Sequence, residues 1–405
     1  MDQSTGRIYN LQFILLCISN ALFSASFNMM IPELPAYLTK LGGEDYKGYI
    51  IGVFTLMAGL SRPFSGKLTD TIGRVPVMIF GSLICVVCSL MYPLVSSVAA
   101  FLLLRFFHGF STGFKPTGTS AYVSDLVPAN RRGEAMGMIG MASIIGMAIG
   151  PAIGGWVAVR WNINVMFQLS AAFALLSVAI LTGAMKETLP NKQPFSLSLL
   201  RIHRNEIFEP LVWGPVIVTF LTFFSYGAIL TVIPDYSTYL GIANKGLFFT
   251  FYTASSMGIR FLAGKVSDKY GRIPILKVSS LIMAVSMLML AFATKSYILL
   301  TAAVFYGMAT GLNSPAVTAW TVDLSNPLFK GRALASMYIA MEAGIGLGAW
   351  LSALIYHNHS ERFPMTFFVL AGITSVAILY LSFFHVPRNF EEQMARRQAA
   401  EAARH

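Results

Sequence analysis

Long apolar stretches, separated by glycine, proline or charged residues, occupy the chain between residues 11 and 385. Each runs to about 20 residues or more, which is the length that a helix needs to cross the hydrocarbon core of a bilayer. The pattern predicts six membrane helices in the first part of the chain, near 11–38, 48–67, 76–95, 100–124, 133–159 and 165–185. Six more follow, near 211–240, 246–266, 275–294, 298–322, 332–356 and 364–385.

A polar, basic and proline-bearing segment separates the two sets of apolar stretches and reads as a linker. The first ten residues are polar, and the run that begins at Leu11 is far longer than the apolar region of a signal peptide, so we expect a first membrane helix and no cleaved signal. The predicted organisation is a cytoplasmic amino terminus (1–10), a six-helix bundle (11–185), a cytoplasmic linker (186–210), a second six-helix bundle (211–385) and a cytoplasmic tail (386–405).

Composition excludes a soluble or disordered chain. The 405 residues are 55% hydrophobic and 12% charged, with a mean hydropathy of +0.64, whereas about a quarter of a typical soluble domain is charged. The net charge of +11 suggests nucleic acid at first sight. With the amino terminus placed in the cytoplasm, however, 19 lysines and arginines fall on the cytoplasmic side and 6 on the other. This bias accounts for the basic excess without nucleic acid and predicts a multi-pass membrane protein with both termini in the cytoplasm.

An internal repeat divides the chain into related halves. The segment RPFSGKLTDTIGRVPVM at 62–78 realigns with RFLAGKVSDKYGRIPIL at 260–276, at an offset of 198 residues. Continuing without a gap, eight further glycines, alanines and aspartates of the first half fall on identical residues, among them Gly146 on Gly344 and Gly150 on Gly348. Six helices per half keep the repeats parallel, so we expect a binding site between them near the membrane midplane.

These motifs resemble the major facilitator superfamily over essentially the whole chain. The segment from Gly66 to Arg74 is similar to the family's helix 2–3 loop signature, although Thr71 and Val75 replace two basic positions. Arg105 followed by Gly109 resembles the core of its helix 4 signature. The fold implied is two pseudo-symmetric six-helix bundles, an all-α membrane protein with twelve transmembrane helices.

The resemblance implies that the duplicated loop acts as a latch. In related transporters it stabilises the outward-open state through contacts between the two halves. The alternative is that these residues are only topology and folding signals, because exposed ion pairs contribute little. The first latch would comprise Gly66, Asp70, Gly73, Arg74 and Asp125, and its partial copy Gly264, Asp268, Gly271, Arg272 and Asp323.

A glycine and proline motif in the predicted helix at 133–159 resembles the family's antiporter signature. Small residues every four positions let helices approach closely, and a proline removes one backbone hydrogen bond, so we expect a packing hinge. Glycine packing with no bearing on transport direction is the alternative. The motif comprises Gly146, Gly150, Pro151, Gly154 and Gly155.

Polar residues inside the predicted helices are the candidate substrate contacts. The stripe from Arg105 to Tyr122 follows one helical face that lipid would not tolerate. Its bases favour a substrate with an acidic or polar headgroup. The resemblance implies that helices 1, 4, 7 and 10 line the cavity, and hydrogen bonding within the bundles is the alternative. The candidates are Asn20, Ser24, Asn28, His108, Thr112, Lys115, Thr119, Tyr226, Tyr306, Thr310, Asn313 and Trp320.

Glu342 is the one acid predicted near a helix centre. A carboxylate is costly there, which suits a proton carrier; a fixed pair with Lys115 or another base is the alternative. The resemblance also implicates Arg105 in proton coupling, with structural anchoring as the competing interpretation. Glu33 and Asp235 occupy matching places near the outer ends of helices 1 and 7, and we expect them at an outer rim, although simple solvation would explain them equally well.

The sequence therefore predicts a monomeric, proton-coupled exporter of a small amphiphilic or partly anionic compound. Its partners would be the substrate, protons and the lipid bilayer, without nucleic acid. We find no GxxxxGK[ST] or HExxH motif in the sequence, and we expect no enzyme activity, cofactor or metal. An uptake symporter for a sugar or organic anion is one alternative, and a nontransporting receptor or lipid-handling scaffold is another.

Overall fold

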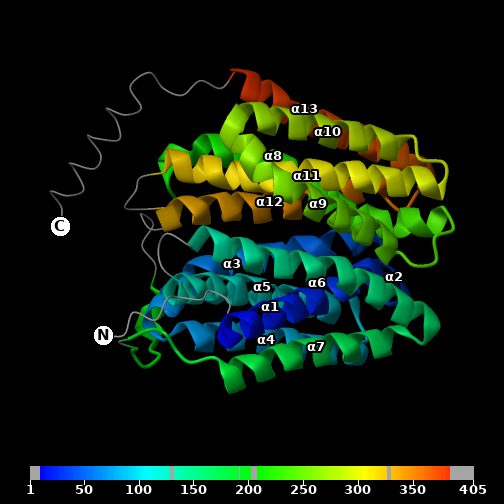
Figure 1. Cartoon of the computed structure of the whole chain (residues 1–405). Helices are drawn as coiled ribbons and strands as arrows, with labels where there is room; N and C mark the ends of the chain where they lie inside the picture. Colours follow the sequence, from blue (N-terminus) through cyan, green and yellow to red (C-terminus); the bar gives the residue numbers. More distant parts are fainter. Residues whose placement is uncertain (1–9, 128–131, 191, 202–207, 326–329, 384–405) are drawn as a thin grey trace.

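The computed structural model describes residues 10–127, 132–190, 192–201, 208–325 and 330–383, and most of them are helical (Figure 1). The helices of the first half are α1 (Leu11–Met30), α2 (Leu34–Lys40), α3 (Lys47–Thr71), α4 (Arg74–Met91), α5 (Val98–Leu126), α6 (Arg132–Arg160) and α7 (Ile163–Ala184). Those of the second half are α8 (Trp213–Tyr239), α9 (Gly246–Tyr270), α10 (Arg272–Ala291), α11 (Ser296–Leu324), α12 (Lys330–Tyr356) and α13 (Phe363–Phe383).

Local chemistry explains where several helices begin and break. Side-chain oxygens of Asn10, Ser97 and Asn162 accept hydrogen bonds from the first turns of α1, α5 and α7, as N-cap residues do. The first predicted helix is observed as α1, a 3₁₀ turn and α2, because Pro32 and Pro35 cannot donate to the helical ladder. When α1 and α2 are counted as one span, the described residues contain twelve membrane helices, as predicted.

Eight of these spans, within the described residues, are long and apolar enough to cross a membrane by composition alone. The other four, α3, α5, α9 and α11, have 25 to 29 residues each but contain more polar side chains than most of the eight. Helices of this kind are tolerated where they face protein or water rather than lipid. The less apolar helices therefore belong inside the assembly, next to the other half or the space between the halves.

The two sets of helices form two bundles that lie against each other (Figure 1). Contacts between the bundles come mainly from α3 against α12 and from α6 against α9. We call the side where α1 begins and α13 ends the terminal face, and the other side the opposite face. We call these two lines of contact between the bundles the α3–α12 seam and the α6–α9 seam. Each half contributes one helix to each seam, and the internal repeat relates the two seams to each other.

The glycine stripe of α6 packs directly on the backbone of α1. A Cβ atom at Gly150 would lie 2.6 Å from the carbonyl oxygen of Ala25, and Gly146 and Gly154 are equally close to the α1 backbone one turn away on either side. Such contact is possible only without side chains. The carboxy-terminal half repeats it, because glycines of α12 meet the backbone of α8.

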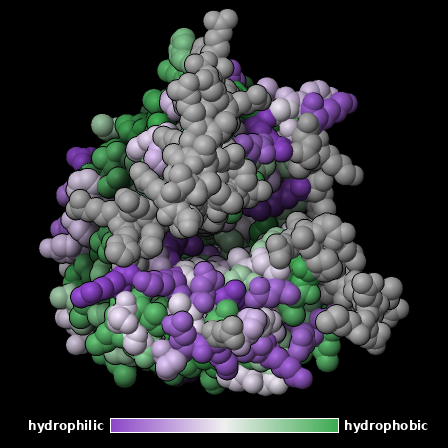
Figure 2. Space-filling model, turned by 90° about the vertical axis from the view of Figure 1, so that its left-hand side faces the viewer, coloured by the Kyte–Doolittle hydropathy of each residue, from purple (hydrophilic) through white to green (hydrophobic). Residues whose placement is uncertain are grey.

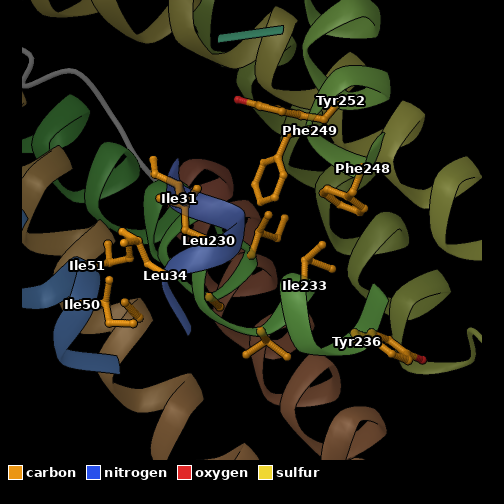
Figure 3. Close-up of a cluster of buried hydrophobic side chains, with 14 of the residues drawn as sticks. Ile31, Leu34, Ile50, Ile51, Leu230, Ile233, Tyr236, Phe248, Phe249 and Tyr252 are labelled. Atoms are coloured by element: carbon orange, nitrogen blue, oxygen red, sulfur yellow. The ribbon is translucent and has the colours of Figure 1, made fainter. Parts of the chain in front are cut away.

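Buried apolar residues show where the halves join. Near the opposite face they form one core shared by both halves, which includes Ile31, Leu34, Ile50 and Ile51 from one half and Leu230, Ile233, Tyr236, Phe248, Phe249 and Tyr252 from the other (Figure 3). Toward the terminal face, each half has a separate core. The terminal face is hollowed between the halves, and hydrophilic residues border the hollow (Figure 2). The structure is thus closed at the opposite face and open at the terminal face.

Candidate functional site

An ion pair joins the two halves near the middle of the membrane helices. The guanidinium of Arg62 on α3 donates to the carboxylate of Glu342 on α12 at 2.6 Å, and these side chains are only 15% and 9% exposed. Gly59, one turn before Arg62 on α3, lies beside Glu342, and a Cβ atom there would be 3.5 Å from the Cβ of Glu342. The Arg62 guanidinium also lies over the ring of Tyr338, 5.0 Å from its centroid. In this conformation the base that pairs with Glu342 is therefore Arg62 rather than Lys115.

Two further ion pairs cross between the halves near the opposite face. The ammonium of Lys47, at the start of α3, lies 2.7 Å from the carboxylate of Asp235 on α8. The ammonium of Lys245, which directly precedes α9, lies 3.1 Å from the carboxylate of Glu33, just before α2. The internal repeat places Lys47 on Lys245. Each half therefore offers one lysine and one acid, and the two pairs are reciprocal.

The first predicted latch is assembled within its own half. The Arg74 guanidinium lies 2.9 Å from Asp70 and 3.1 Å from Asp125. Glu187, which follows α7, accepts a hydrogen bond from the Arg74 backbone at 3.0 Å. Gly66 lies on α3 with open space beside it. In this conformation the loop joins α3, α4, α5 and the segment after α7, and among the described residues it makes no hydrogen bond or ion pair with the other half.

The second copy repeats part of this arrangement. Arg272 lies 3.0 Å from Asp323, as Arg74 does from its acid on α5. Gly73 and Gly271 both have positive φ, 126° and 89°, a conformation that favours glycine and lets the chain turn sharply into α4 and α10. Two predicted positions have side chains outside the described residues, Gly264 and Asp268.

Arg105 on α5 is buried inside the amino-terminal half. Its guanidinium donates to the backbone carbonyl of Ile50 on α3 at 3.1 Å and to the hydroxyl of Tyr92 at 3.3 Å. It also stacks on Phe54 of α3, 4.4 Å from the ring centroid. Arg105 therefore fixes the segment of α3 that lies between Lys47, at the start of the helix, and Arg62 of the central ion pair.

The other two bases of the α5 stripe are also fully buried in the same half. His108 contacts the hydroxyl of Tyr92 at 3.2 Å and the thiol of Cys85 at 3.3 Å. The ammonium of Lys115 donates to the hydroxyls of Ser19 and Ser177 at 2.8 and 2.7 Å. Among the described residues, no carboxylate lies within ion-pair distance of Lys115. Substrate contact by these bases stays a prediction.

The remaining amino-terminal candidates take part in hydrogen bonds inside their bundle. Asn20 donates to the Ile139 carbonyl of α6, and Asn28 donates to the Ser24 carbonyl one turn back on α1. The hydroxyls of Thr112 and Thr119 donate to backbone carbonyls of α5 itself. In this conformation these polar groups are satisfied, as the alternative interpretation of the stripe expects.

The carboxy-terminal candidates surround an aromatic cluster. Tyr252 of α9 packs against Tyr226 of α8 and Tyr306 of α11, with ring centroids 5.9 and 5.4 Å apart. Thr310 follows one turn after Tyr306 and is half-buried. Two other candidates lie nearer the terminal face: Asn313, which donates to Ser279, and Trp320, which packs in the carboxy-terminal core.

The α6 motif contacts both halves. Besides the glycines that pack on α1, Gly155 faces the side chain of Asn244, and the Pro151 carbonyl lies against Gly246 at the start of α9. Asn244 donates to the Ala152 carbonyl at 3.2 Å. The motif thus holds α6 between its own bundle and the other half, which is the position that a hinge requires.

An apolar groove of about 840 Å³ runs along the seam between α3 and α12. Glycines on both helices make room for it, and Glu342 lies on its wall. Several of its lining side chains are exposed on the molecular surface: Tyr49, Leu56, Leu60, Leu347 and Trp350. The groove therefore connects the apolar outer surface with the central ion pair.

Sequence reasoning identified the acids of the three pairs that cross between the halves and missed the bases, Lys47, Arg62 and Lys245. A signal for Arg62 was present, because Arg62 and Arg260 begin the two copies of the duplicated segment. A charged residue at repeat-related positions inside two membrane helices is costly and therefore indicates function.

The comparisons with known proteins agree with this architecture. The sequence matches the Major Facilitator Superfamily over residues 16–259 and 215–403. It is similar to the multi-drug resistance efflux pump PmrA of Streptococcus pneumoniae, with 27% identity over 311 residues that cover 74% of this chain and 78% of the pump. It is also similar to the multidrug resistance protein MdtG of Klebsiella pneumoniae, with 24% identity over 372 residues that cover 89% of this chain and 90% of that protein.

Two solved structures share the fold. The human organic anion transporter MFSD10 (TETRAN) superposes with a TM-score of 0.71 at 18% identity, covering 91% of this chain and 98% of that one. A D-xylose-proton symporter superposes with a TM-score of 0.76 at 17% identity, covering 92% and 97%. At these identities the likeness concerns the arrangement of the helices.

Proposed function

Starting from the Major Facilitator Superfamily, to which this chain belongs, we propose that it is a proton-coupled secondary active transporter that exports a small amphiphilic or partly anionic compound. The observation that carries the proposal is the Arg62–Glu342 pair, which lies between the halves and is mostly withdrawn from solvent. A single proton on Glu342 would remove one of its charges. One bacterial relative is a multi-drug resistance efflux pump and another is a multidrug resistance protein, and this similarity supports export.

Protonation of Glu342 would act on the contact between the halves. Removing one partner of a buried ion pair costs about 3–5 kcal/mol. Shifting a two-state equilibrium from 1:99 to 99:1 needs about 5.5 kcal/mol, so one proton at this pair supplies an effect of the right size. Neutral Glu342 would release Arg62 and weaken the α3–α12 seam, and alternating access would follow as the halves rock about the shared core.

The reciprocal pairs Lys47–Asp235 and Lys245–Glu33 would close the opposite face. If the termini lie in the cytoplasm of a bacterial cell, as the distribution of basic residues suggests, the opposite face is the outer side of the inner membrane. The conformation described here is then inward-facing and ready to accept a substrate for export. Both pairs, and the shared apolar core beneath them, would have to separate before release outside.

Arg105 would contribute by positioning α3. It donates to the Ile50 carbonyl and stacks on Phe54, so it fixes the helix that carries both Lys47 and Arg62. A change of proton state at the centre could then reach the opposite face through α3 as a rigid element. The apolar groove between α3 and α12 supports an amphiphilic substrate, whose apolar part could reach the centre from the bilayer.

The direct test uses purified protein in liposomes that contain a pH-sensitive dye, with candidate amphiphiles added under an imposed proton gradient. Proton movement opposite to substrate movement would support antiport. Proton movement in the same direction as the substrate would replace the proposal with uptake symport. Ligand binding without any gradient-dependent flux would favour a nontransporting receptor or lipid-handling scaffold. If the monomer is the working unit, the purified protein that retains transport should have the molecular mass of a single chain.

A further inference from the structure

Two arginines at repeat-related positions have different partners. Arg62 on α3 is paired with Glu342, and its guanidinium lies over the ring of Tyr338. Arg260 occupies the same position on α9 and lies within electrostatic range of the hydroxyls of Tyr338 and Tyr252. Among the described residues, however, no carboxylate lies within ion-pair distance of Arg260.

The sequence itself explains this difference. The gapless repeat places Gly344 and Gly348 of α12 on Gly146 and Gly150 of α6, so that the position equivalent to Glu342 is Ile144. Ile144 is buried and apolar. The acid that would complete the second pair is therefore replaced by a hydrocarbon side chain, and among the described residues the positive charge of Arg260 has no carboxylate to compensate it.

The guanidinium of Arg260 also has an unsatisfied donor. Its Nε atom is buried and has no hydrogen-bond partner within the part of the chain that the structure describes. Arginine stays protonated in proteins, and a buried donor without a partner costs free energy. Arg62 likewise has a buried, unpartnered Nε, but its charge is compensated by Glu342. Among the described residues, Arg260 has neither a partner for its Nε atom nor a carboxylate for its charge. An anion bound at Arg260 would therefore gain more free energy than an anion bound at Arg62.

The surroundings of Arg260 suit an aromatic or apolar body attached to that anion. Tyr252, next to Arg260, is in ring contact with Tyr226 and Tyr306, so that α8, α9 and α11 each contribute one ring. Tyr338, over whose ring the Arg62 guanidinium lies, is also within electrostatic range of Arg260. A guanidinium beside aromatic rings recognises a flat carboxylate or sulfonate and offers apolar contact to the rest of the molecule.

We propose that Arg260 binds the anionic headgroup of the substrate, a carboxylate or sulfonate, while the aromatic body of the substrate packs against the cluster around Tyr252. This inference rests on the proposed function in that the ligand would be the transported compound. Binding can be measured without transport, so the two can fail separately. Arg260 would select the substrate, and the Arg62–Glu342 pair would respond to the proton.

The test compares three naphthalene probes that differ in charge: 1-naphthylacetate, its neutral amide, and 2-(1-naphthyl)ethylamine. Binding to the purified full-length protein is measured by isothermal titration calorimetry. We expect the wild type to bind the acid at least tenfold more tightly than the amide or the amine, and Arg260→Gln to abolish that preference. Equal affinity for acid and amide, no binding of the acid, or an unchanged preference in Arg260→Gln would each overturn the proposal.

A second pair of variants tests the site without removing the arginine. Ile144→Glu places the missing carboxylate at the repeat-related position, and Ile144→Gln is its neutral control of the same size. In the glutamate variant we expect the ratio of the affinities for acid and amide to fall at least tenfold, because an internal carboxylate would occupy Arg260. We expect the glutamine variant to keep the wild-type ratio. Loss in both variants with unchanged melting temperatures, or loss in neither, would count against the site.

Failure of the two proposals is distinguishable. An acid preference that depends on Arg260, without proton-linked flux in liposomes, would leave the binding site standing and overturn the transport mechanism. Proton-linked flux of neutral or cationic amphiphiles that is unaffected by Arg260→Gln would leave the transport mechanism standing and overturn the binding site.

Discussion

The Lys47 ammonium lies 2.7 Å from the carboxylate of Asp235, and this contact joins the first residue of α3 to α8 across the two halves. The Lys245–Glu33 pair reproduces it with the roles of the halves exchanged. The four side chains are 9% to 18% exposed, so solvent screens these pairs less than pairs on an open surface. Together with the shared apolar core, they hold the opposite face closed.

Breaking one of these pairs should favour opening of the opposite face. Asp235→Asn removes the charge but keeps an oxygen that can accept from the Lys47 ammonium, so we expect a cost of about 1–2 kcal/mol rather than that of losing a partner altogether. We therefore expect roughly a tenfold shift in the ratio of the two conformations. Distances between spin labels on the loops near residues 43 and 243, measured by double electron–electron resonance, report the shift. The charge-swapped double variant Lys47→Glu/Asp235→Lys should restore the wild-type distribution, and an unaltered distribution in Asp235→Asn would refute the gate.

Removing the charge of Glu342 should separate substrate movement from proton movement. In Glu342→Gln the carboxamide can still bond to Arg62, but it cannot gain or lose a proton. We expect loss of proton-driven flux, roughly a hundredfold or more, with substrate exchange retained. The measurement is flux into liposomes with and without a proton gradient. Glu361→Gln, in the exposed loop before α13, is the matched control and should behave as wild type. If substrate flux in Glu342→Gln still depends fully on the proton gradient, Glu342 is not the proton-coupling residue.

Arg105 should not be replaceable by lysine. The guanidinium bonds at once to the Ile50 carbonyl and the Tyr92 hydroxyl, whereas an ammonium cannot span both while stacking on Phe54. We expect Arg105→Lys to reduce proton-driven flux by about tenfold or more and Tyr92→Phe, which removes one of the bonds, to reduce it less. If Arg105→Lys transports normally, the charge alone is sufficient and a positioning role for α3 is wrong.

The α1–α6 contact should tolerate no added side chain. In Gly150→Ala the new Cβ would lie 2.6 Å from the Ala25 carbonyl oxygen, and forcing the helices apart costs about 1–3 kcal/mol. We expect a lower melting temperature for the detergent-solubilised protein. Gly137→Ala, on the same helix, is the control, because a Cβ there meets open space and alanine favours the helix by about 1 kcal/mol. Equal melting temperatures for the two variants would contradict the close packing.

Much of this architecture could be predicted from the sequence, because each membrane helix is encoded by a short continuous apolar segment. The apolar runs, the linker and the repeat are properties of residues near one another along the chain, and the bilayer permits few other structures for them. The acids Glu33, Asp235 and Glu342 were also identifiable, since carboxylates are rare in such helices. The break between α1 and α2 is different, because the apolar pattern predicted a single helix near 11–38 and the structure shows the interruption at Pro32 and Pro35.

The partners of those acids could not be predicted, because each lies in the other half. Lys47 and Asp235 are 188 positions apart, and Arg62 and Glu342 are 280 apart. Which of many bases meets a given acid depends on how the bundles pack. The same limit applied to α5, whose polar stripe was predicted correctly as a face but could not be assigned to the cavity or to the bundle interior without the positions of α1, α3 and α4.

The sequence by itself determined the twelve helices, their division into two related bundles and the family to which the chain belongs, because hydrophobic length, repeat spacing and loop motifs are encoded in short segments. Only the tertiary structure decided that Glu342 meets Arg62, that no acid among the described residues meets Arg260, and that the halves are joined at the opposite face and parted at the terminal face. Those relationships depend on the distances between helices, which no segment of the chain specifies alone.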